Sequence, residues 1–308
     1  MGTLGLPGAY LSPFEFEVSE VSDKSTIEWT DATWNPIRGC TRVSEGCRNC
    51  YAEHIAARFS EPGQPYEGIA QWTKSREPRW TGKIVPVPEH LKDPIGWKRP
   101  RMIFVNSMSD LFHENLSFEF VIQICHVMRL APQHTYQILT KRPERMRYFF
   151  ERAWQEMPPA NWWLGTSVED QPTADRRIPE LLKTRATVRW ISAEPLLGPI
   201  PLWEFGPIPA LDWVVVGGES GPNARPMNPE WPQLIRDQCV SAGVPFFFKQ
   251  WGEWIPTIVP GAGLTPVRVG KHKAGRLLDG CEWNEYPRGV GIGEANRSSK
   301  ADLAAPVR

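Results

Sequence analysis

Three of the six cysteines of this chain lie in one short stretch, as Cys40, Cys47 and Cys50. Six residues separate the first two and two separate the last two, and we call residues 40–50 the cysteine loop. Thiolates clustered in a reducing compartment indicate metal ligation or redox chemistry more than a disulfide framework. Soft sulfur ligands suit zinc or an iron–sulfur cluster. Gly39 and Gly46 each precede a cysteine and, lacking Cβ, let the backbone fold tightly around a bound group.

Two kinds of metal site fit this loop. A closed zinc site needs a fourth ligand, and His54, on a predicted helix over residues 51–59, would complete a Cys3His site. Such a protein would be non-catalytic and would serve as a binding module. The alternative is a 4Fe-4S cluster bound by three cysteines, with the fourth iron open to a substrate or cofactor. The spacing of the cysteines leaves both alternatives open.

Composition limits the classes of protein that the chain can belong to. Its 308 residues are 41% hydrophobic and 23% charged, and the formal net charge is zero. The chain therefore has no overall electrostatic field that would indicate a nucleic-acid or membrane partner. The sequence contains no long apolar run and no recognisable signal peptide, so we expect a cytoplasmic protein without a membrane partner. The fifteen tryptophans predict either a Trp-rich core, the more common case, or aromatic walls around a pocket.

Short apolar runs separated by amphipathic segments dominate the chain after residue 101. The runs lie at residues 102–105, 136–139, 162–165, 188–191, 213–216 and 245–248, and residues 27–30 predict an earlier strand before the cysteine loop. Helices are predicted over residues 118–130, 143–154, 173–182 and 229–242. Repeated βαβ units of this kind form a parallel sheet. We expect an α/β fold, a complete or partial (β/α) barrel, because polar residues follow every strand and no dinucleotide glycine fingerprint is present.

The chain is expected to divide into three parts. Residues 1–24 form a flexible N-terminal arm, residues 25–255 the barrel domain, and residues 256–308 a partly disordered C-terminal extension. Residues 61–100, rich in Pro, Gly, Lys and Arg, are a surface insertion in the barrel. Its basic stretch 74–101, with Trp72, Trp80 and Trp97, could contact phosphates and stack on bases, or be a solvated loop anchored by tryptophans.

Polar side chains follow the predicted strands, and the carboxyl ends of barrel strands share one mouth. The residues expected to gather there beside the cysteine loop are Asn106, Ser107, Asp110, Lys141, Arg142, Ser167, Glu169, Glu194, Glu219, Lys249 and Gln250. Each of these residues also has an explanation that needs no functional site. Lys141 and Arg142 could belong to a solvated helix face, and Ser167 and Glu169 could be helix-capping residues. Glu194 and Lys249 could form a structural ion pair. The convergence of all these polar residues at one end of a barrel favours a functional site.

The chain resembles the phage-associated three-Cys-motif proteins, whose relatives are regarded as radical S-adenosylmethionine (SAM)-like. The resemblance covers residues 25–287 and is carried by the motifs WNPIRGCTRVSEGCRNCYAE, FVNSMSDLFHE, ILTKRPERM, WLGTSVEDQ, WISAEPLLGP, VVVGGESGPNARPM and FFFKQWGEW. The commonest radical SAM signature has three residues between its first two cysteines and an aromatic residue before the third. Here six residues separate Cys40 from Cys47, and Asn49 precedes Cys50.

The resemblance implies an enzyme whose 4Fe-4S cluster is held by the three cysteines and whose fourth iron chelates SAM. An external electron donor would drive cleavage of SAM to methionine and a 5′-deoxyadenosyl radical, with a nucleic acid or nucleotide as candidate substrate and a protein as a further candidate partner. The residues implied for methionine are Asn106, Ser107 and Ser109, or alternatively Gly217, Gly218 and Glu219. Ser167 and Glu169 are implied for the ribose, Lys141 or Arg142 for a carboxylate or phosphate, and Glu194 and Lys249 for catalysis.

Overall fold

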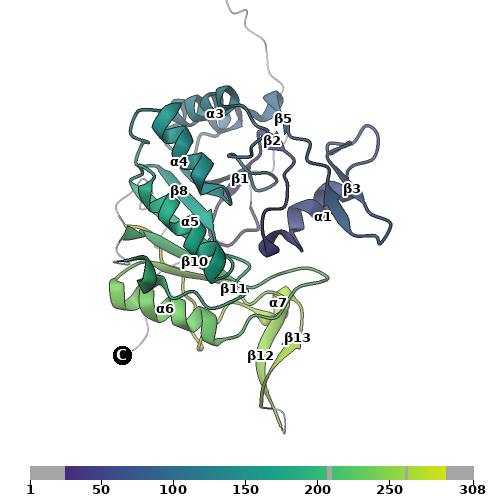
Figure 1. The fold of residues 1–308 in the computed structure, drawn as a ribbon, viewed down its shortest axis with the longest axis vertical. Coiled ribbons are helices and arrows are strands. Elements are labelled where there is room, and N and C mark those ends of the chain that lie inside the picture. Colours follow the sequence, from purple (N-terminus) through teal and green to yellow (C-terminus); the bar gives the residue numbers. More distant parts are fainter. Residues whose placement is uncertain (1–24, 207–209, 261–262, 289–308) are drawn as a thin grey trace, which may run out of the picture.

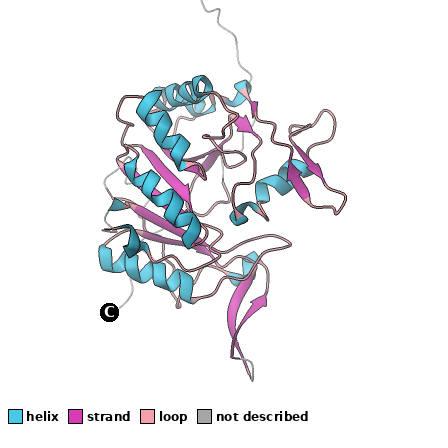
Figure 2. Ribbon diagram, in the orientation of Figure 1, coloured by secondary structure: helices cyan, strands magenta, loops and turns pink. Residues whose placement is uncertain are grey.

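The computed structural model describes residues 25–206, 210–260 and 263–288. The predicted N-terminal arm and residues 289–308 of the predicted extension lie outside this part of the chain. At its centre is a seven-stranded sheet with the order β1-β6-β7-β8-β9-β10-β11, in which every pair of neighbours is parallel. Each strand pairs with the next main strand in the chain, and the sheet curves into a half-barrel (Figures 1 and 2). The predicted partial (β/α) barrel is confirmed.

The elements of the half-barrel agree closely with the predicted ones. The strands are β1 (Ala32–Trp34), β6 (Met102–Val105), β7 (Thr135–Thr140), β8 (Trp162–Ser167), β9 (Val188–Ala193), β10 (Trp213–Gly217) and β11 (Phe246–Gln250). The helices are α3 (Phe118–Leu130), α4 (Pro143–Arg152), α5 (Gln171–Lys183) and α6 (Glu230–Ala242), with the 3-10 helix η3 (Leu202–Phe205) between β9 and β10. Only the first strand is misplaced by the prediction, because Thr30 N donates to Ile27 O at 3.3 Å in a turn.

Successive residues of each strand face opposite sides of the sheet, and each side has its own core. On β6, Ile103 and Val105 pack with the helices, whereas Phe104 joins a separate aromatic cluster inside the half-barrel. The tryptophans of this inner cluster are Trp29, Trp163, Trp190 and Trp213. A Trp-rich core is therefore confirmed.

Gly165 of β8 makes room for one of these inner tryptophans. A Cβ on Gly165 would lie 2.5 Å from Cε2 of Trp190, whose Nε1 donates to the carbonyl of Trp163 at 3.2 Å. The indole of Trp190 therefore lies directly against the backbone of the neighbouring strand.

We predict that Gly165→Ala lowers the free energy of unfolding by about 1–3 kcal/mol, because the added methyl group overpacks the inner cluster. Urea unfolding would measure the change. Gly96→Ala is the matched control, since no atom lies within 4 Å of a Cβ at that exposed position. Equal stability of the two variants would contradict the packing that we describe.

The segment between β1 and β6 forms a small lobe beside the half-barrel. It contains β2 (Ile37–Arg38), η1 (Glu45–Cys47), α1 (Tyr51–Arg58), β3 (Ala70–Trp72), β4 (Pro78–Trp80), β5 (Val85–Pro86), η2 (Pro88–His90) and α2 (Asp93–Gly96). The hairpin β3–β4 packs on α1 and projects from the molecule with it, at the right of Figure 1. Strand β5 pairs with β2, so the predicted insertion is tied to the segment that precedes the cysteine loop.

The chain after β11 first leaves the half-barrel and then returns to it. Strands β12 (Trp254–Val259) and β13 (Gly263–Arg268) form a projecting hairpin that precedes α7 (Lys271–Ala274). Residues 275–286, which we call the cover segment, then run along β11, where Phe248 N donates to Trp283 O at 2.9 Å. Leu278 is fully buried in the core between the sheet and the helices. The predicted extension therefore contains a segment that is part of the barrel, although we placed the domain boundary at residue 255.

No helix in the described part of the chain is long and apolar enough to cross a lipid bilayer.

Candidate functional site

A cavity of about 380 Å³ lies at the carboxyl ends of the strands, which we call the mouth of the half-barrel. Cys40, Cys47 and Cys50 all line it. The other predicted site residues that line it are Asn106, Ser107, Ser109, Asp110, Lys141, Arg142, Ser167, Glu194, Gly218, Glu219 and Lys249, whereas Gln250 does not line it. Glu169 and Gly217 are not among its lining residues. The structure thus brings together nearly all of the side chains that the strand ends were predicted to present.

The three cysteines of the loop are free, partly buried thiols. Burial raises the pKa of the Cys40 thiol, and Asp110, Cys50 and Cys47 raise it further against the opposing effect of Arg142. Burial also raises the pKa of Cys50. A metal binds the thiolate form, so metal binding here would displace protons.

His54 does not join the cysteines at the cavity. It lies on α1, and its ring centroid is 6.2 Å from that of Trp72 in an edge-to-face arrangement. His54 is not among the cavity-lining residues. In the described part of the chain, no three His, Cys, Asp or Glu side chains are grouped closely enough to hold a single metal ion.

Glu169, at the end of β8, fixes the middle of the cysteine loop. Its buried carboxylate accepts hydrogen bonds from Ser44 Oγ at 3.0 Å and from Lys141 Nζ at 3.1 Å. Arg177 Nη1, from α5, reaches both oxygens at 3.0 and 3.1 Å. The backbone of the loop passes so close that a Cβ on Gly46 would lie 2.2 Å from Glu169 Cγ. Since both oxygens are occupied, Glu169 positions the loop and is not placed to hold a ribose.

The charge on Glu169 follows from its neighbours. Burial alone would raise the pKa of this carboxyl, but Lys141 and Arg177 outweigh burial and hold its pKa below the ordinary value. Because the folded-state pKa is lowered, the stabilisation is present at neutral pH and is lost as the pH falls through that lowered value.

Glu219, after β10, fixes the second half of the loop in a similar way. Its carboxylate accepts from Asn49 Nδ2 at 3.0 Å and from Arg225 Nη2 at 2.6 Å. Arg225 Nη2 also donates to the carbonyl of Glu45 at 2.9 Å. Gly218 permits a close approach to the neighbouring turn, since a Cβ there would lie 2.0 Å from the carbonyl oxygen of Trp251. Glu219 therefore clamps the loop, whereas Gly218 packs against the turn that follows β11.

Arg142 fixes the start of the loop. Its Nη1 donates to Asp110 Oδ2 at 3.0 Å, its Nη2 to Thr41 Oγ1 at 2.7 Å and its Nε to Glu114 Oε2 at 2.6 Å. Thr41 Oγ1 also lies 2.9 Å from Nε2 of His113, a buried imidazole whose pKa is lowered by burial and by Arg142. Arg142 is thus engaged by protein groups.

Asn106 and Ser109, which follow β6, differ from these residues because their side chains have no partner. Both line the cavity, and neither the amide atoms of Asn106 nor Oγ of Ser109 makes a hydrogen bond within the protein. Asn106 is 2% exposed and has a left-handed φ of 62°. Buried polar groups are almost always hydrogen-bonded, so such exceptions indicate a site for a ligand or water.

Glu194 and Lys249 form the predicted ion pair inside the mouth. Lys249 Nζ lies 2.5 Å from Glu194 Oε1, and the two side chains come from the ends of β11 and β9. Both line the cavity. The ion pair given above as the structural explanation is therefore present, and its two side chains face the cavity.

Several residues that shape the site were missed by sequence reasoning, namely Asn35, Ser44, Asn49, Tyr51, Arg177 and Arg225. Asn35 Oδ1 accepts from Ser107 Oγ at 3.1 Å and from Met108 N at 3.0 Å, which orders the loop after β6. Arg177 alone carries a sequence signal, because it falls among the buried positions Ala174, Ile178 and Leu181 of α5. A charge on an apolar helix face predicts a buried partner.

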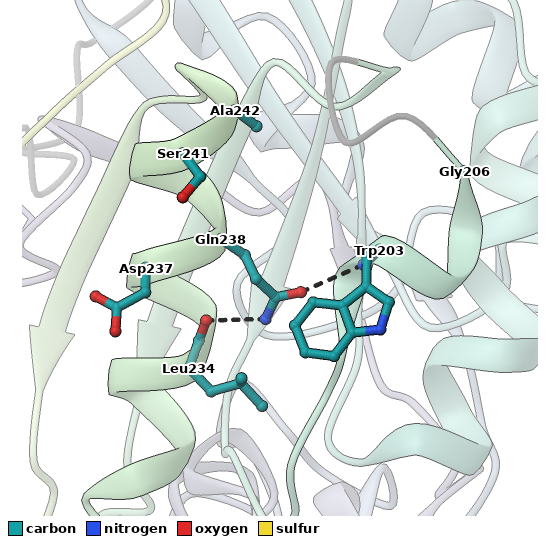
Figure 3. A pocket seen from close by; sticks show the side chains of 7 residues that line it. All are labelled: Trp203, Gly206, Leu234, Asp237, Gln238, Ser241 and Ala242. Carbon is teal, nitrogen blue, oxygen red and sulfur yellow. Dashed lines mark hydrogen bonds between the residues drawn. The ribbon is translucent and has the colours of Figure 1, made fainter.

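A second depression, of about 500 Å³, lies between η3 and α6 (Figure 3). Gln238 spans it, accepting from Trp203 N at 3.2 Å and donating to Leu234 O at 2.8 Å. The amide is therefore satisfied within the protein. None of the predicted site residues lines this depression, so the cysteine-lined cavity is the candidate site.

Residues 24–287 match the model of a protein family described as "Protein of unknown function (DUF5131)". The chain belongs to this family. The DUF5131 match spans the half-barrel, the cysteine loop and the cover segment, so the site lies wholly within the family's region. A search of curated proteins and a search of solved structures each gave no match.

We predict that Glu169→Gln costs about 3 kcal/mol of folding stability, because it leaves Lys141 and Arg177 without their buried counter-charge. Urea unfolding would measure the loss, and faster amide exchange in residues 40–50 would locate it. Glu151→Gln is the control, since it removes an exposed ion pair on α4 and should cost less than about 1 kcal/mol. If both variants lost the same stability, Glu169 would not be the anchor of the loop.

Proposed function

We propose that this DUF5131 protein is a radical SAM-like iron–sulfur enzyme that cleaves SAM reductively, with a nucleic acid or nucleotide as its substrate. The observation that carries the proposal is the composition of one cavity. Three cysteines line it together with two buried polar side chains that lack partners, Asn106 and Ser109. Among the described residues, no fourth cysteine and no histidine lines it. The cavity therefore lacks the histidine of a Cys3His site, and its three thiols match the protein ligands of a cluster with one open iron.

The position of His54 favours a cluster over a Cys3His zinc site. His54 is the fourth ligand that such a zinc site would need. It does not line the cavity and instead packs edge-to-face with Trp72, at a ring-centroid distance of 6.2 Å.

The unpartnered groups support a binding place for the amino-acid part of SAM. The amide of Asn106 and the hydroxyl of Ser109 can together donate to a carboxylate and accept from an amine. Glu219, the alternative, already accepts hydrogen bonds from Asn49 and Arg225. We therefore assign methionine recognition to residues 106–109 and a positioning role to Glu219.

The remaining groups of the cavity have complementary tasks. When bound, a cluster of this kind supplies the electron that cleaves SAM to methionine and a 5′-deoxyadenosyl radical. Trp29, Phe104 and Leu139 form an apolar wall that excludes water from the cavity. Ser167 supplies a hydroxyl for the ribose, and Glu194 with Lys249 can hold and transfer a proton.

We predict that anaerobically reconstituted protein is brown and carries about four irons, as a cubane on three cysteines requires. Cys40→Ser, Cys47→Ser and Cys50→Ser should each lose most of the iron, and His54→Ala should keep it. Iron and sulfide analysis with absorption spectra would measure this, and Cys281→Ser, at an exposed thiol outside the cavity, is the control. Addition of dithionite and SAM should yield 5′-deoxyadenosine. A colourless protein with stoichiometric zinc that is lost in His54→Ala would instead establish the Cys3His binding module.

We also predict that Asn106→Gly weakens SAM binding about tenfold, because one hydrogen bond to a charged group is lost. Glycine is chosen because it keeps the left-handed backbone of residue 106 without strain. Calorimetric titration of SAM into the reconstituted protein would give the dissociation constant. Ser220→Ala, at a hydroxyl on the same cavity that already has a partner in Gln250, should change it less than twofold. Unchanged affinity in Asn106→Gly would exclude residues 106–109 from SAM recognition.

A further inference from the structure

Helix α1 exposes its large apolar side chains to solvent. Its buried apolar positions hold only alanines, Ala52, Ala56 and Ala57, whereas the large residues Tyr51 and Ile55 are 50% and 40% exposed. Phe59, at its C-cap, is 43% exposed. Residues four apart lie on one helix face, so the exposed apolar side chains form a continuous strip. A strip of this kind marks a surface that contacts another molecule.

The strip begins at the candidate site. Tyr51 lines the cavity, and its hydroxyl donates to the carbonyl of Ser107 at 2.9 Å. At the other side of α1, Trp72 of the β3–β4 hairpin is 48% exposed and contacts His54. Three aromatic rings, those of Tyr51, Phe59 and Trp72, are thus exposed on the lobe that borders the cavity.

Basic and acidic side chains both lie near the strip: exposed Arg48 Nη1 is 3.8 Å from Oε2 of exposed Glu45, and Glu61 is exposed two residues after Phe59. The acidic residue of α1, Glu53, is fully buried on the opposite face and pairs with Arg42, whereas Arg48 and Arg58 are exposed. Lys271 of α7 lines the cavity, where its Nζ lies 3.0 Å from Oε1 of Glu28, and His272 and Lys273 beside it are exposed. Figure 1 shows α1 and α7 on the same side of the molecule, with the cysteine-loop region between them. Exposed basic side chains therefore lie on two separate elements on this side of the molecule, Arg58 on α1 and Lys273 on α7.

We propose that this rim, formed by the exposed face of α1, Trp72 and α7, binds single-stranded nucleic acid and presents one nucleotide to the cavity. The proposal rests on the proposed function, since it takes the cavity to be the reactive site. Exposed aromatic rings interleaved with cations are the means by which proteins hold single strands, through base stacking and phosphate contacts. A base must also be unpaired to enter a cavity. Arg58 and Lys273 are the basic side chains that can contact the phosphates of such a strand.

This rim differs from the basic stretch 74–101 that the sequence suggested. Trp80 of that stretch lines the cavity and Trp72 belongs to the rim. Trp97 instead packs against His134, with a ring-centroid distance of 6.0 Å, and lies under Arg101. Trp97 therefore supports the fold and is not part of the binding surface.

The test is fluorescence anisotropy of labelled single-stranded DNA and RNA oligonucleotides with the reconstituted full chain. Wild-type protein should bind, with affinity that falls as salt increases. Arg58→Ala with Phe59→Ala should weaken binding about tenfold or more, and so should His272→Ala with Lys273→Ala. The matched control is Tyr148→Ala with Arg152→Ala, an exposed aromatic–arginine pair on α4, which should bind like wild type.

The outcomes separate this proposal from the proposed function. Absence of oligonucleotide binding, or equal binding by all variants, would overturn it even if iron and 5′-deoxyadenosine are found. Salt-dependent binding that both rim variants lose would support the rim even if the protein holds no cluster. Self-association that the Arg58→Ala, Phe59→Ala variant abolishes, with no oligonucleotide binding, would assign the strip to a protein contact and also overturn the proposal.

Discussion

The cysteine loop has little regular backbone pairing, so side-chain contacts from the strand ends must hold it in place. The central contact is the buried carboxylate of Glu169, which joins a residue of the loop, a lysine after β7 and an arginine from α5. Removing such a charge from water is costly, and it is tolerated where cations and hydrogen bonds compensate it fully. Glu219 and Arg142 repeat this arrangement at the two ends of the loop. The thiols thereby acquire fixed positions on an otherwise irregular segment.

The polar residues at the mouth of the half-barrel fall into two groups, those that hold the cysteine loop and those whose side chains have no partner. Acidic residues whose oxygens are all engaged, such as Glu169, hold the loop, whereas Asn106 and Ser109 remain available to a ligand. Below them the half-barrel is filled by tryptophans, and the absence of a side chain at Gly165 lets one of these indoles lie against the sheet. A closely packed floor confines any bound molecule to the level of the cysteines.

The sequence was sufficient for the sheet but not for the roles of individual polar residues. Apolar runs such as residues 213–216 are continuous because both faces of a parallel strand are buried, and this made six of the seven strands visible. Strand β1 has only three residues, too few to show the alternation of a strand, and residues 27–30 before it resemble a strand in sequence. Glu169 and Glu219 were correctly placed at the mouth, yet their partners Ser44 and Asn49 are 125 and 170 residues away in the chain. Pairings at such separations leave no local pattern, so a ligand-binding role could not be told from an anchoring one.

The cover segment has a consequence for how the protein is made on the ribosome. Strand β11 contributes Lys249 to the cavity, and its free edge is capped by residues that are synthesised after all seven strands and both strands of the projecting hairpin. Arg276, from that late segment, donates to the carbonyl of Lys249 at 3.0 Å. A nascent chain that has not yet delivered residues 275–286 therefore exposes a sheet edge capable of pairing with other chains. Completion of the candidate site is in this way coupled to the end of translation of the barrel, and prematurely terminated chains would be left as targets for chaperones and proteases.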